Sequence, residues 1–359
     1  MKYIDEYRDK RLVGVLVDEI RKTSRNPFRI MEVCGGHTVA IRKFGIPALL
    51  PPTVQLLSGP GCPVCVTERS YIDKAILLAR LPGTLITTYG DLMRVPGSSS
   101  SLEKEKANGA MIRMVYSPLD SLEIARQHPD REIIFLGIGF ETTSPASAVT
   151  ILRAKREKLN NFHLLSAHKI MPPAMEMLID LTVQIDGYIC PGHVSTITGS
   201  GAYASIVEKY GLGCVITGFE PTDLLQGILM LVRQFESKDP KVEIQYKRAV
   251  RPEGNKKALG YLDKAFELKD DRWRGLGLVP KSGFRLKKEY REFEAESFFE
   301  MNIPESKEEK ACICGEILKG LKRPPECRLF GRACTPENPV GACMVSPEGA
   351  CQAYFRYGE

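Results

Sequence analysis

Cysteine and histidine residues stand beside glycines at several places in this sequence, where their side chains can reach a ligand. The first is CGGHT, residues 34–38, in which only two glycines separate the Cys34 thiol from the His37 imidazole. Paired glycines allow positive φ and a close approach of the backbone to a bound group. A thiolate and a neutral imidazole both bind borderline transition metals, whereas an imidazolium would lower the pKa of the thiol for nucleophilic attack. We therefore expect Cys34 and His37 to bind a metal or to attack a substrate; a buried structural cysteine is the alternative.

A second thiol motif, GPGCPVC, occupies residues 59–65 and holds Cys62 and Cys65 in a C-x-x-C spacing. It falls at the end of an expected strand and the start of an expected helix. This spacing allows a reducible disulfide, and the free N–H groups at a helix start stabilise a thiolate. The spacing is also half of a zinc site, but no second C-x-x-C lies nearby. We expect redox chemistry or shared metal ligation by this pair.

Two further motifs follow strands in the second half of the chain. The segment GFETT, residues 139–143, is not a dinucleotide fingerprint, because Thr142 stands where the third glycine belongs. Glu141 is expected to hold a partner His or Lys or to act as an acid or base, and helix capping is the alternative. In PGHVS, residues 191–195, His193 again follows a glycine. Taken alone, His193 would be a hydrogen-bonded structural residue. If it faced His37 across a cleft, it would be part of the functional site.

The C-terminal segment is rich in cysteine and proline. Six of the eleven cysteines fall within its last part, at Cys312, Cys314, Cys327, Cys334, Cys343 and Cys351. Thiolates in proline-rich loops, with little apolar sequence between them, are typical of an iron–sulfur cluster that holds a segment together. Four ligands suffice for a [4Fe–4S] cluster, and the remaining two could form a redox-active dithiol. Zinc is the rival, and colour separates the two, because Zn²⁺ sites are colourless.

Short apolar runs alternate with helical patterns along the rest of the chain. The runs expected to be strands are 29–33, 53–58, 84–88, 111–116, 132–137, 162–166, 187–190 and 214–218. This order predicts an α/β protein with parallel sheets. The first four strands are echoed by the second four at offsets of 102 to 108 residues, which suggests a duplication. Ligands bind at the carboxyl ends of parallel strands, and the motifs above nearly all follow a strand.

We therefore expect two similar Rossmann-like parallel-sheet domains that face a central cleft, plus a small loop-rich iron–sulfur domain. The expected boundaries are 25–122 for the domain with CGGHT and GPGCPVC, 123–240 for the domain with GFETT and PGHVS, and 241–359 for the iron–sulfur domain, joined by the N-terminal helix 1–24.

The composition excludes several classes of protein. Hydrophobic residues make up 43% and charged residues 26% of the 359 positions, as in globular proteins. No run approaches the roughly 18 apolar residues of a membrane span, and the acidic N-terminus is unlike a signal peptide. The net charge of +6 is too small to suggest a nucleic-acid binder. We expect a cytoplasmic protein that binds neither membrane nor nucleic acid.

Taken together, CGGHT, GPGCPVC, GFETT, PGHVS and the tail motifs CICGEIL and GACMVSPEGAC resemble the [NiFe]-hydrogenase maturation factor family HypD over essentially the whole chain. The resemblance implies a scaffold with redox activity on which the Fe(CN)₂CO centre of the hydrogenase is assembled. Its implied partners are a HypC-like chaperone, a HypE-like cyanide donor supplied by a HypF-like protein, and indirectly the hydrogenase large subunit.

The resemblance also implies roles for individual cysteines. Cys34 would bind iron together with a cysteine of the HypC-like partner, and Cys62 and Cys65 would form a thiol/disulfide pair beside it. The tail is similar to ferredoxin:thioredoxin reductase. By that likeness, the cluster ligands would be Cys312, Cys327, Cys334 and Cys351, and the redox pair would be Cys314 and Cys343, with the roles of Cys343 and Cys351 the least secure. The alternative function is a [4Fe–4S]-dependent thiol/disulfide oxidoreductase, and a zinc-stabilised interaction module is a third.

Overall fold

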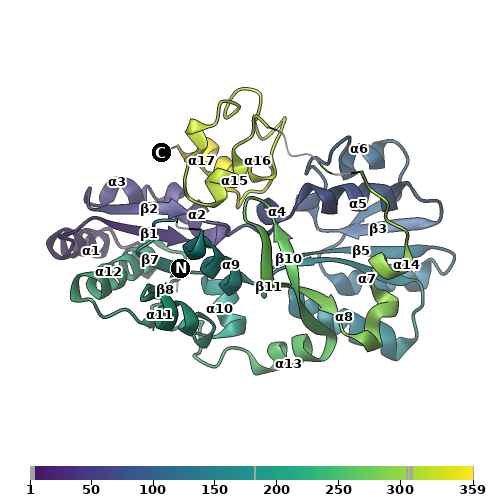
Figure 1. Ribbon diagram of the computed structural model, residues 1–359, viewed down its shortest axis with the longest axis horizontal. Coiled ribbons are helices and arrows are strands. Elements are labelled where there is room, and N and C mark those ends of the chain that lie inside the picture. Colours follow the sequence, from purple (N-terminus) through teal and green to yellow (C-terminus); the bar gives the residue numbers. More distant parts are fainter. Residues whose placement is uncertain (1–4, 182, 305, 307–309, 359) are drawn as a thin grey trace.

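The computed structural model describes residues 5–181, 183–304, 306 and 310–358. Within these residues the strands form two parallel sheets and one antiparallel hairpin (Figure 1). Sheet A has the order β2-β1-β7-β8-β9, sheet B the order β4-β3-β5-β6, and the hairpin pairs β10 with β11. The strands are β1 Phe28–Glu32, β2 Val54–Ser58, β3 Thr84–Thr88, β4 Ile112–Met114, β5 Glu132–Gly139, β6 Phe162–His168, β7 Gly187–Cys190, β8 Gly213–Ile216, β9 Val242–Ile244, β10 Phe266–Trp273 and β11 Gly277–Leu286.

Helices connect the strands. They are α1 Lys10–Thr23, α2 Gly35–Lys43, α3 Ile46–Leu49, α4 Pro63–Val66, α5 Arg69–Arg80, α6 Leu102–Ala107, α7 Pro118–Gln127, α8 Ser144–Glu157, α9 Met171–Asp180, α10 Gly192–Thr198, α11 Ala204–Tyr210, α12 Pro221–Ser237, α13 Lys256–Ala265, α14 Ala295–Phe298, α15 Cys314–Leu318, α16 Ala342–Val345 and α17 Ala350–Tyr357. Short 3₁₀ turns occur as well, among them η1 Asp5–Arg8.

The eight runs expected to be strands correspond to β1 to β8, so the α/β prediction with parallel sheets is confirmed. Strands β3 and β7 are buried along their whole length. Parallel strands are apolar throughout because connecting helices cover both faces of the sheet. That is why runs such as TLITT and GYIC could be recognised without alternation.

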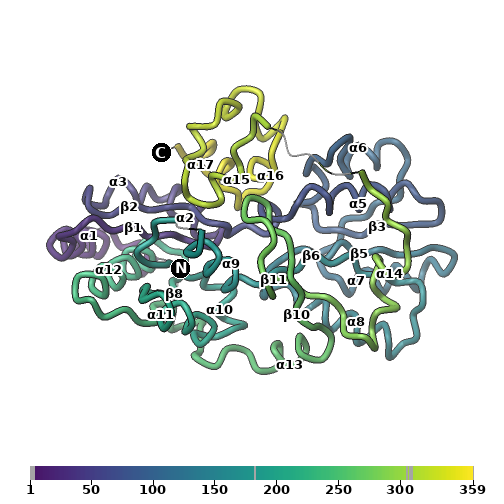
Figure 2. The backbone as a smooth tube through the Cα atoms, viewed as in Figure 1, coloured from purple at the N-terminus to yellow at the C-terminus, as the bar shows by residue number. Residues whose placement is uncertain are grey.

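The expected domain boundaries are wrong, because the chain crosses between the sheets. Strands β1 and β2 lie in sheet A, whereas β3 and β4 lie in sheet B; β5 and β6 then extend sheet B, and β7 to β9 return to sheet A. Figure 2 shows these two passages of the chain. Each sheet therefore takes strands from both sides of residue 122. The physical reason is that β1 pairs with both β2 and β7, so its two neighbours come from opposite halves of the sequence.

The strand orders agree with the duplication inferred from the sequence. Matching β1 to β4 with β5 to β8 converts the order β2-β1-β7-β8 of sheet A into β6-β5-β3-β4. That is the order of sheet B read from its other end. A repeat whose two copies exchange half their strands gives this arrangement.

The third expected domain is also smaller than predicted. Helix α1 packs on α12, where Leu16 and Ile20 join the apolar cluster of sheet A. It therefore does not belong with the cysteine-rich segment, because its apolar face is buried elsewhere. Strand β9 extends sheet A, and the β10–β11 hairpin packs against β6 and α9. The loop-rich cysteine segment consists of residues 310–358, which form a lobe at the top of the view in Figure 1, above α2 and α4.

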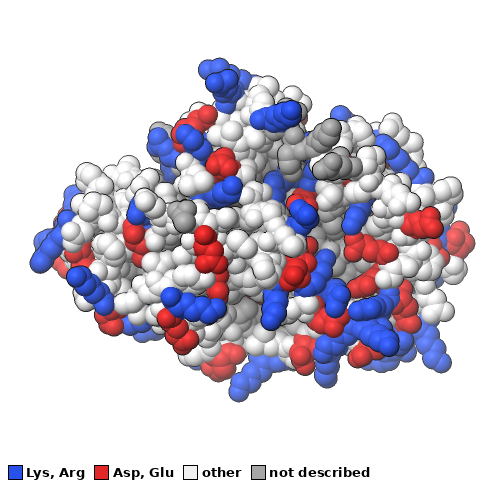
Figure 3. All heavy atoms as spheres, viewed as in Figure 1, with Lys and Arg blue, Asp and Glu red and all other residues white. Residues whose placement is uncertain are grey.

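No helix among the described residues combines the length and apolar character that a membrane crossing requires. On the face seen in Figure 3, basic and acidic side chains are interspersed.

Candidate functional site

Three of the predicted motifs meet at the carboxyl edge of sheet A. Cys34 follows β1, Cys62 follows β2, and His193 follows β7. These strands are parallel neighbours in the order β2-β1-β7, so their carboxyl ends lie at one edge, as in other α/β proteins. The structure therefore brings together the CGGHT, GPGCPVC and PGHVS motifs, although Cys34 and His193 are 159 positions apart in the sequence.

Cys34 is half-buried at the start of α2, held between two backbone segments. Its N–H donates to Oε2 of Glu32 at 3.1 Å, and the other carboxyl oxygen of Glu32 accepts the Thr38 hydroxyl at 2.6 Å. On the opposite side, a Cβ added to Gly61 would lie 2.2 Å from the Cys34 nitrogen. The glycine of GPGC is thus required for the loop to lie flat against CGGHT. The backbones of the two motifs are therefore in direct contact at Cys34.

The surroundings of Cys34 keep protons on the site. Burial and the nearby carboxylate of Glu348 raise the pKa of the Cys34 thiol to about 12. The backbone N–H groups of His37 and Gly36 have a smaller effect in the opposite direction. Burial likewise raises the pKa of the Glu32 carboxyl to about 8. Because metal ions bind thiolates, a metal at Cys34 must displace this proton.

His37 is completely buried and forms one layer of an aromatic stack. Its Nε2 lies 3.1 Å from the carbonyl oxygen of Gly218 and 3.3 Å from that of Thr217, so Nε2 carries the proton and donates it. Its Nδ1 has no hydrogen-bond partner among the described residues. Burial lowers the pKa of His37 to about 4, so the ring is neutral. Phe219 stacks on His37 with centroids 4.6 Å apart and on His193 at 4.1 Å. Phe219 therefore contacts both histidine rings.

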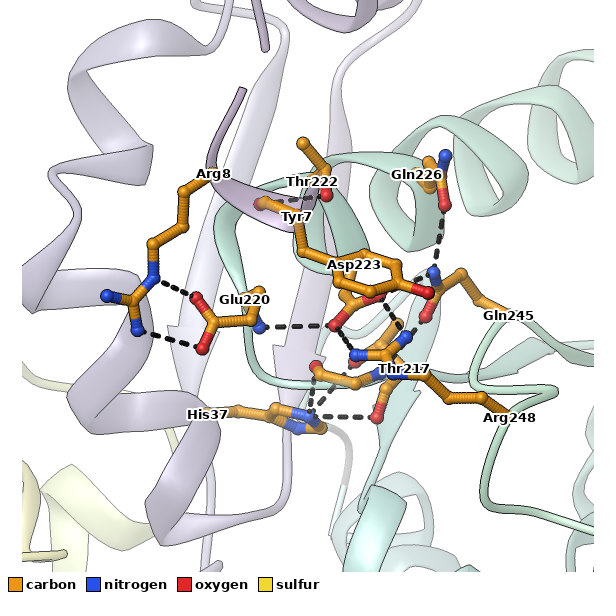
Figure 4. A network of polar contacts seen from close by, with 11 residues as sticks. Tyr7, Arg8, His37, Thr217, Glu220, Thr222, Asp223, Gln226, Gln245 and Arg248 are labelled. Carbon is orange, nitrogen blue, oxygen red and sulfur yellow. Dashed lines mark hydrogen bonds and ion pairs between the residues drawn. The ribbon is translucent and has the colours of Figure 1, made fainter. Parts of the chain in front are cut away.

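A polar network fixes the turn that carries Phe219 (Figure 4). Asp223, which is fully buried, accepts two hydrogen bonds from the Arg248 guanidinium. That guanidinium is stacked 3.9 Å from the ring centroid of Tyr7, and the carbonyl oxygen of Tyr7 accepts the Thr222 hydroxyl at 2.9 Å. The N-terminal turn η1 is therefore tied to the loop that accepts the His37 proton.

Cys62 and Cys65 lie together at the start of α4, as the C-x-x-C spacing predicted. Their sulfur atoms are 2.6 Å apart, and the Cys65 N–H donates to the Cys62 sulfur at 3.3 Å. Both side chains are buried, with exposures of 3% and 0%. Burial raises the pKa of the Cys65 thiol well above its usual value.

Cys343 connects the C-x-x-C pair to the cysteine-rich segment. Its thiol lies within reach of the thiols of Cys65, Cys314 and Cys351, and interaction with them lowers its pKa. Helix α16, which carries Cys343, accordingly packs on α4. Sulfur atoms thus follow one another from Cys62 through Cys65 and Cys343 to Cys314.

The cysteine-rich segment encloses a small cavity. Five of its cysteines share the lining with apolar side chains, and the lining residues are Cys312, Cys314, Ile317, Cys327, Leu329, Phe330, Cys334, Gly341, Met344 and Cys351. A Cβ at Gly341 would lie 2.6 Å from the Cys314 sulfur and 3.0 Å from the Cys312 sulfur, so the thiols approach bare backbone there. Across the described parts of the chain no three metal-binding side chains converge on a single ion. The thiols surround a space, and such an apolar, thiol-lined space fits an iron–sulfur cluster.

Glu141 lies apart from this group, at the carboxyl edge of sheet B. It follows β5, and its Oε1 accepts the N–H of Met171 at 3.0 Å, which caps the start of α9. The other carboxyl oxygen is buried without a hydrogen-bond partner among the described residues. Burial raises the pKa of Glu141 to about 7. The capping role that the sequence left open is the one the geometry shows.

Several residues at the site were not singled out from the sequence. Phe219 stands three residues after the end of β8, so the rule that locates motifs at strand ends could have identified it. Glu32 is the last residue of β1, and a carboxylate that directly follows the buried Ile30 and Met31 is such a signal. Glu348 lies so close that a Cβ added to Gly35 would be 2.4 Å from its own Cβ. No sequence pattern could have identified Glu348, because only the tertiary fold places it beside CGGHT.

Comparison with known proteins identifies close relatives. The family model HypD, described as "Hydrogenase formation hypA family", matches residues 11–358. The hydrogenase maturation factor HypD2 of Bradyrhizobium diazoefficiens is 49% identical, with 100% of this chain and 97% of the relative covered. The hydrogenase maturation factors HypD of Azotobacter vinelandii and Rhizobium leguminosarum are each 48% identical, with 100% of this chain and 97% and 96% of the relatives covered.

Proposed function

The chain belongs to the HypD family of hydrogenase maturation factors, and from that membership and the geometry of the site we propose that it is the scaffold and redox component for assembly of the Fe(CN)₂CO centre of [NiFe] hydrogenase. Its partners are a HypC-like chaperone and a HypE-like cyanide donor, which a HypF-like protein supplies. The hydrogenase large subunit receives the product.

One observation carries this proposal. The segment that carries the half-buried Cys34 packs against Gly61 of the loop that leads into the buried dithiol, and further thiols continue from that dithiol to a thiol-lined cavity. Assembly of an iron–cyanide centre needs a thiolate that holds iron and a source of electrons that releases cyanide from sulfur. In this fold the candidate iron-binding thiol and the dithiol that would supply electrons follow two neighbouring strands of sheet A.

Cys34 is the residue of this chain that binds the iron substrate, and a cysteine of the HypC-like partner completes the thiolate pair. The accessible side of Cys34 allows a second protein to approach, whereas Gly61 and Glu32 fix its backbone from below. The Nε2–H of His37 donates to two carbonyl oxygens, so only Nδ1 is left as a possible ligand atom. Phe219 and His193 form the aromatic wall of the site.

The dithiol supplies the electrons. Cleavage of the C–S bond in a thiocyanate takes up two electrons and one proton and yields a thiol and cyanide. Oxidation of Cys62 and Cys65 to a disulfide provides those two electrons and two protons, of which one goes to the thiol formed and the other is released to water. Cys343 then attacks the Cys65 sulfur, Cys62 leaves as the thiolate, and Cys314 displaces Cys65 from Cys343. The disulfide has moved to Cys314 and Cys343, and Cys62 and Cys65 are thiols again.

The cavity would hold a [4Fe–4S] cluster through Cys312, Cys327, Cys334 and Cys351. Cys351 lines the cavity whereas Cys343 is not among its lining residues, which supports Cys351 as the ligand and Cys343 as a member of the redox pair. When bound, such a cluster supplies one-electron chemistry next to the pair. Leu329, Phe330 and Met344 exclude water from it.

Infrared spectroscopy of the complex with the HypC-like partner tests the proposal. The complex should contain one more iron than the cluster alone and show bands of bound CN and CO. Cys34→Ala should remove these bands, because the iron loses its ligand, while the brown colour of the cluster persists. Cys190→Ala is the matched control, since that thiol is buried in the core of sheet A. Bands of full intensity in Cys34→Ala would show that the iron ligand is another residue.

The continuous row of sulfur atoms also favours a second function, a [4Fe–4S]-dependent thiol/disulfide oxidoreductase. In that case the reduced protein would reduce a protein disulfide without any partner, and no additional iron would bind. Assaying disulfide reduction by the isolated reduced protein separates the two functions. Reduction that depends on Cys62 and Cys65 but not on Cys34 would favour the oxidoreductase.

A further inference from the structure

The β10–β11 hairpin is pinned to the body of the protein by a buried lysine. Lys169, which follows β6 and is 2% exposed, donates from Nζ to Asp271 at 2.9 Å and to the carbonyl oxygen of Arg272 at 2.7 Å. Trp273 is fully buried, and its Nε1 donates to the Ser282 hydroxyl on the other strand at 2.8 Å. Breaking a buried ion pair is strongly destabilising. The end of the hairpin next to its tip is therefore fixed beside β6 of sheet B.

The tip of the hairpin is bonded to the short helix that carries the C-x-x-C pair. Arg274, which is 5% exposed, donates its N–H to the carbonyl oxygen of Val66 at 2.7 Å. Its Nε and Nη2 both donate to the carbonyl oxygen of Thr67, at 3.1 and 3.0 Å. Helix α4 has only four residues, so its last carbonyl groups need partners from outside the helix. The hairpin provides them, and the position of Cys65 depends on that support.

The same tip touches the turn that carries Cys314. Gly275 has φ +83°, and a Cβ on it would lie 2.8 Å from the Cα of Gly315 and 2.9 Å from its carbonyl oxygen. Two backbones are in direct contact here, with no side chain between them. Gly315 follows Cys314 in α15, so this backbone contact fixes the distance between α15 and the hairpin tip. Figure 1 shows the tip reaching toward α4 and the cysteine-rich segment.

We propose that the hairpin tip, through Arg274 and Gly275, is the positioning element that holds α4 and the cysteine-rich segment at the separation at which Cys65 and Cys343 touch. The inference rests on the proposed function, in which these two cysteines exchange a disulfide. Arg274 holds the helix of one thiol, and Gly275 supports the segment of the other. A shift of about 1 Å between reacting groups lowers a rate on the order of 100-fold, so a small change at the tip slows the exchange.

Disulfide trapping in the full-length protein with its cluster measures this contact. In a Cys62→Ser background Cys65 lacks its usual partner, so mild oxidation with diamide and peptide mass spectrometry report the Cys65–Cys343 disulfide. Gly275→Ala is compared with Gly277→Ala. Both glycines have positive φ, +83° and +78°, but nothing lies within 4 Å of a Cβ at Gly277. The two variants share the backbone strain and differ only in the contact.

A second pair of variants avoids backbone strain. Arg274→Met removes the hydrogen bonds to Thr67 but keeps an unbranched side chain, and Arg272→Met changes the exposed neighbour. We expect the Cys65–Cys343 disulfide to form on the order of tenfold more slowly in Gly275→Ala and Arg274→Met. The two controls should match the Cys62→Ser background, and all four variants should keep the visible absorbance of the cluster.

Equal trapping rates in Gly275→Ala and Gly277→Ala, or in the two arginine variants, would overturn the proposal. Loss of cluster absorbance in both tip variants would also overturn it, because the tip would then be a structural support of the segment. The infrared bands of the partner complex are a separate measurement on the protein with Cys62 intact. Their absence there refutes the assembly function and leaves the trapping comparison valid.

Discussion

The substitution Gly61→Ala should abolish iron binding at Cys34 while the protein remains folded. A Cβ at this position would lie 2.2 Å from the Cys34 nitrogen and 2.5 Å from its Cα, against 3.4 Å for ordinary contacts. The GPGC loop and the start of α2 must therefore separate by about 1 Å. The atoms in the way belong to the backbone, so no side-chain rotation relieves the contact. Overpacking of this kind costs about 1–3 kcal/mol in the free energy of unfolding, whereas a displacement of this size costs on the order of 100-fold at a reacting centre.

Two measurements on one preparation check this prediction. Thermal unfolding and the visible absorbance of the cluster should change little, and the infrared bands of CN and CO in the partner complex should disappear. Gly14→Ala is the matched control, since nothing lies within 4 Å of a Cβ at that helical glycine. Infrared bands of normal intensity in a folded Gly61→Ala protein would show that the contact between the two motifs does not position Cys34.

Three further predictions concern the stability of the fold and the cluster. Burial raises the pKa of Glu141 from 4.5 to about 7, so the native protein loses stability as the pH rises through this interval. Relative to the wild type, Glu141→Gln should gain on the order of 3 kcal/mol between pH 4.5 and 7, and a stability difference in urea that does not change with pH would contradict the raised pKa. Arg248→Met should cost about 3 kcal/mol, because Asp223 would remain buried without its guanidinium; a change below about 0.5 kcal/mol in urea unfolding would refute this account of the network. Cys351→Ser should remove the visible absorbance of the cluster, while Cys343→Ser keeps it; the opposite pattern would exchange the two roles.

Glu141 shows what a sequence motif alone can and cannot predict. The sequence placed GFETT after a strand, which is where it lies, and it could not say to which sheet that strand belongs. Strand β5 belongs to sheet B, whereas the strands before CGGHT, GPGCPVC and PGHVS belong to sheet A. The side chain therefore caps α9 and is absent from the thiol group. A strand's own residues do not specify its neighbours, since pairing is decided by burial of distant apolar faces.

The sequence by itself determined the local chemistry and the local structure. The eight short apolar runs became strands because residues such as those of TLITT are stable only with both faces covered. The paired thiols at Cys62 and Cys65 are adjacent because the C-x-x-C spacing brings their side chains to the same side of the chain. The paired glycines at 35 and 36 signalled that another group could approach the backbone closely at the site. The family followed from these motifs and their order.

Only the tertiary structure decided which distant segments share a sheet and which thiols touch. The exchange of strands between the two sheets brings β7 beside β1, and with it His193 to the edge that carries Cys34. Cys343 meets Cys65 because α16 packs on α4, with the hairpin tip against α4 and α15. These contacts join residues far apart in sequence, and their energies come from the burial of whole faces and from backbone groups that need partners. No local pattern carries that information, because it belongs to the packing of the complete chain.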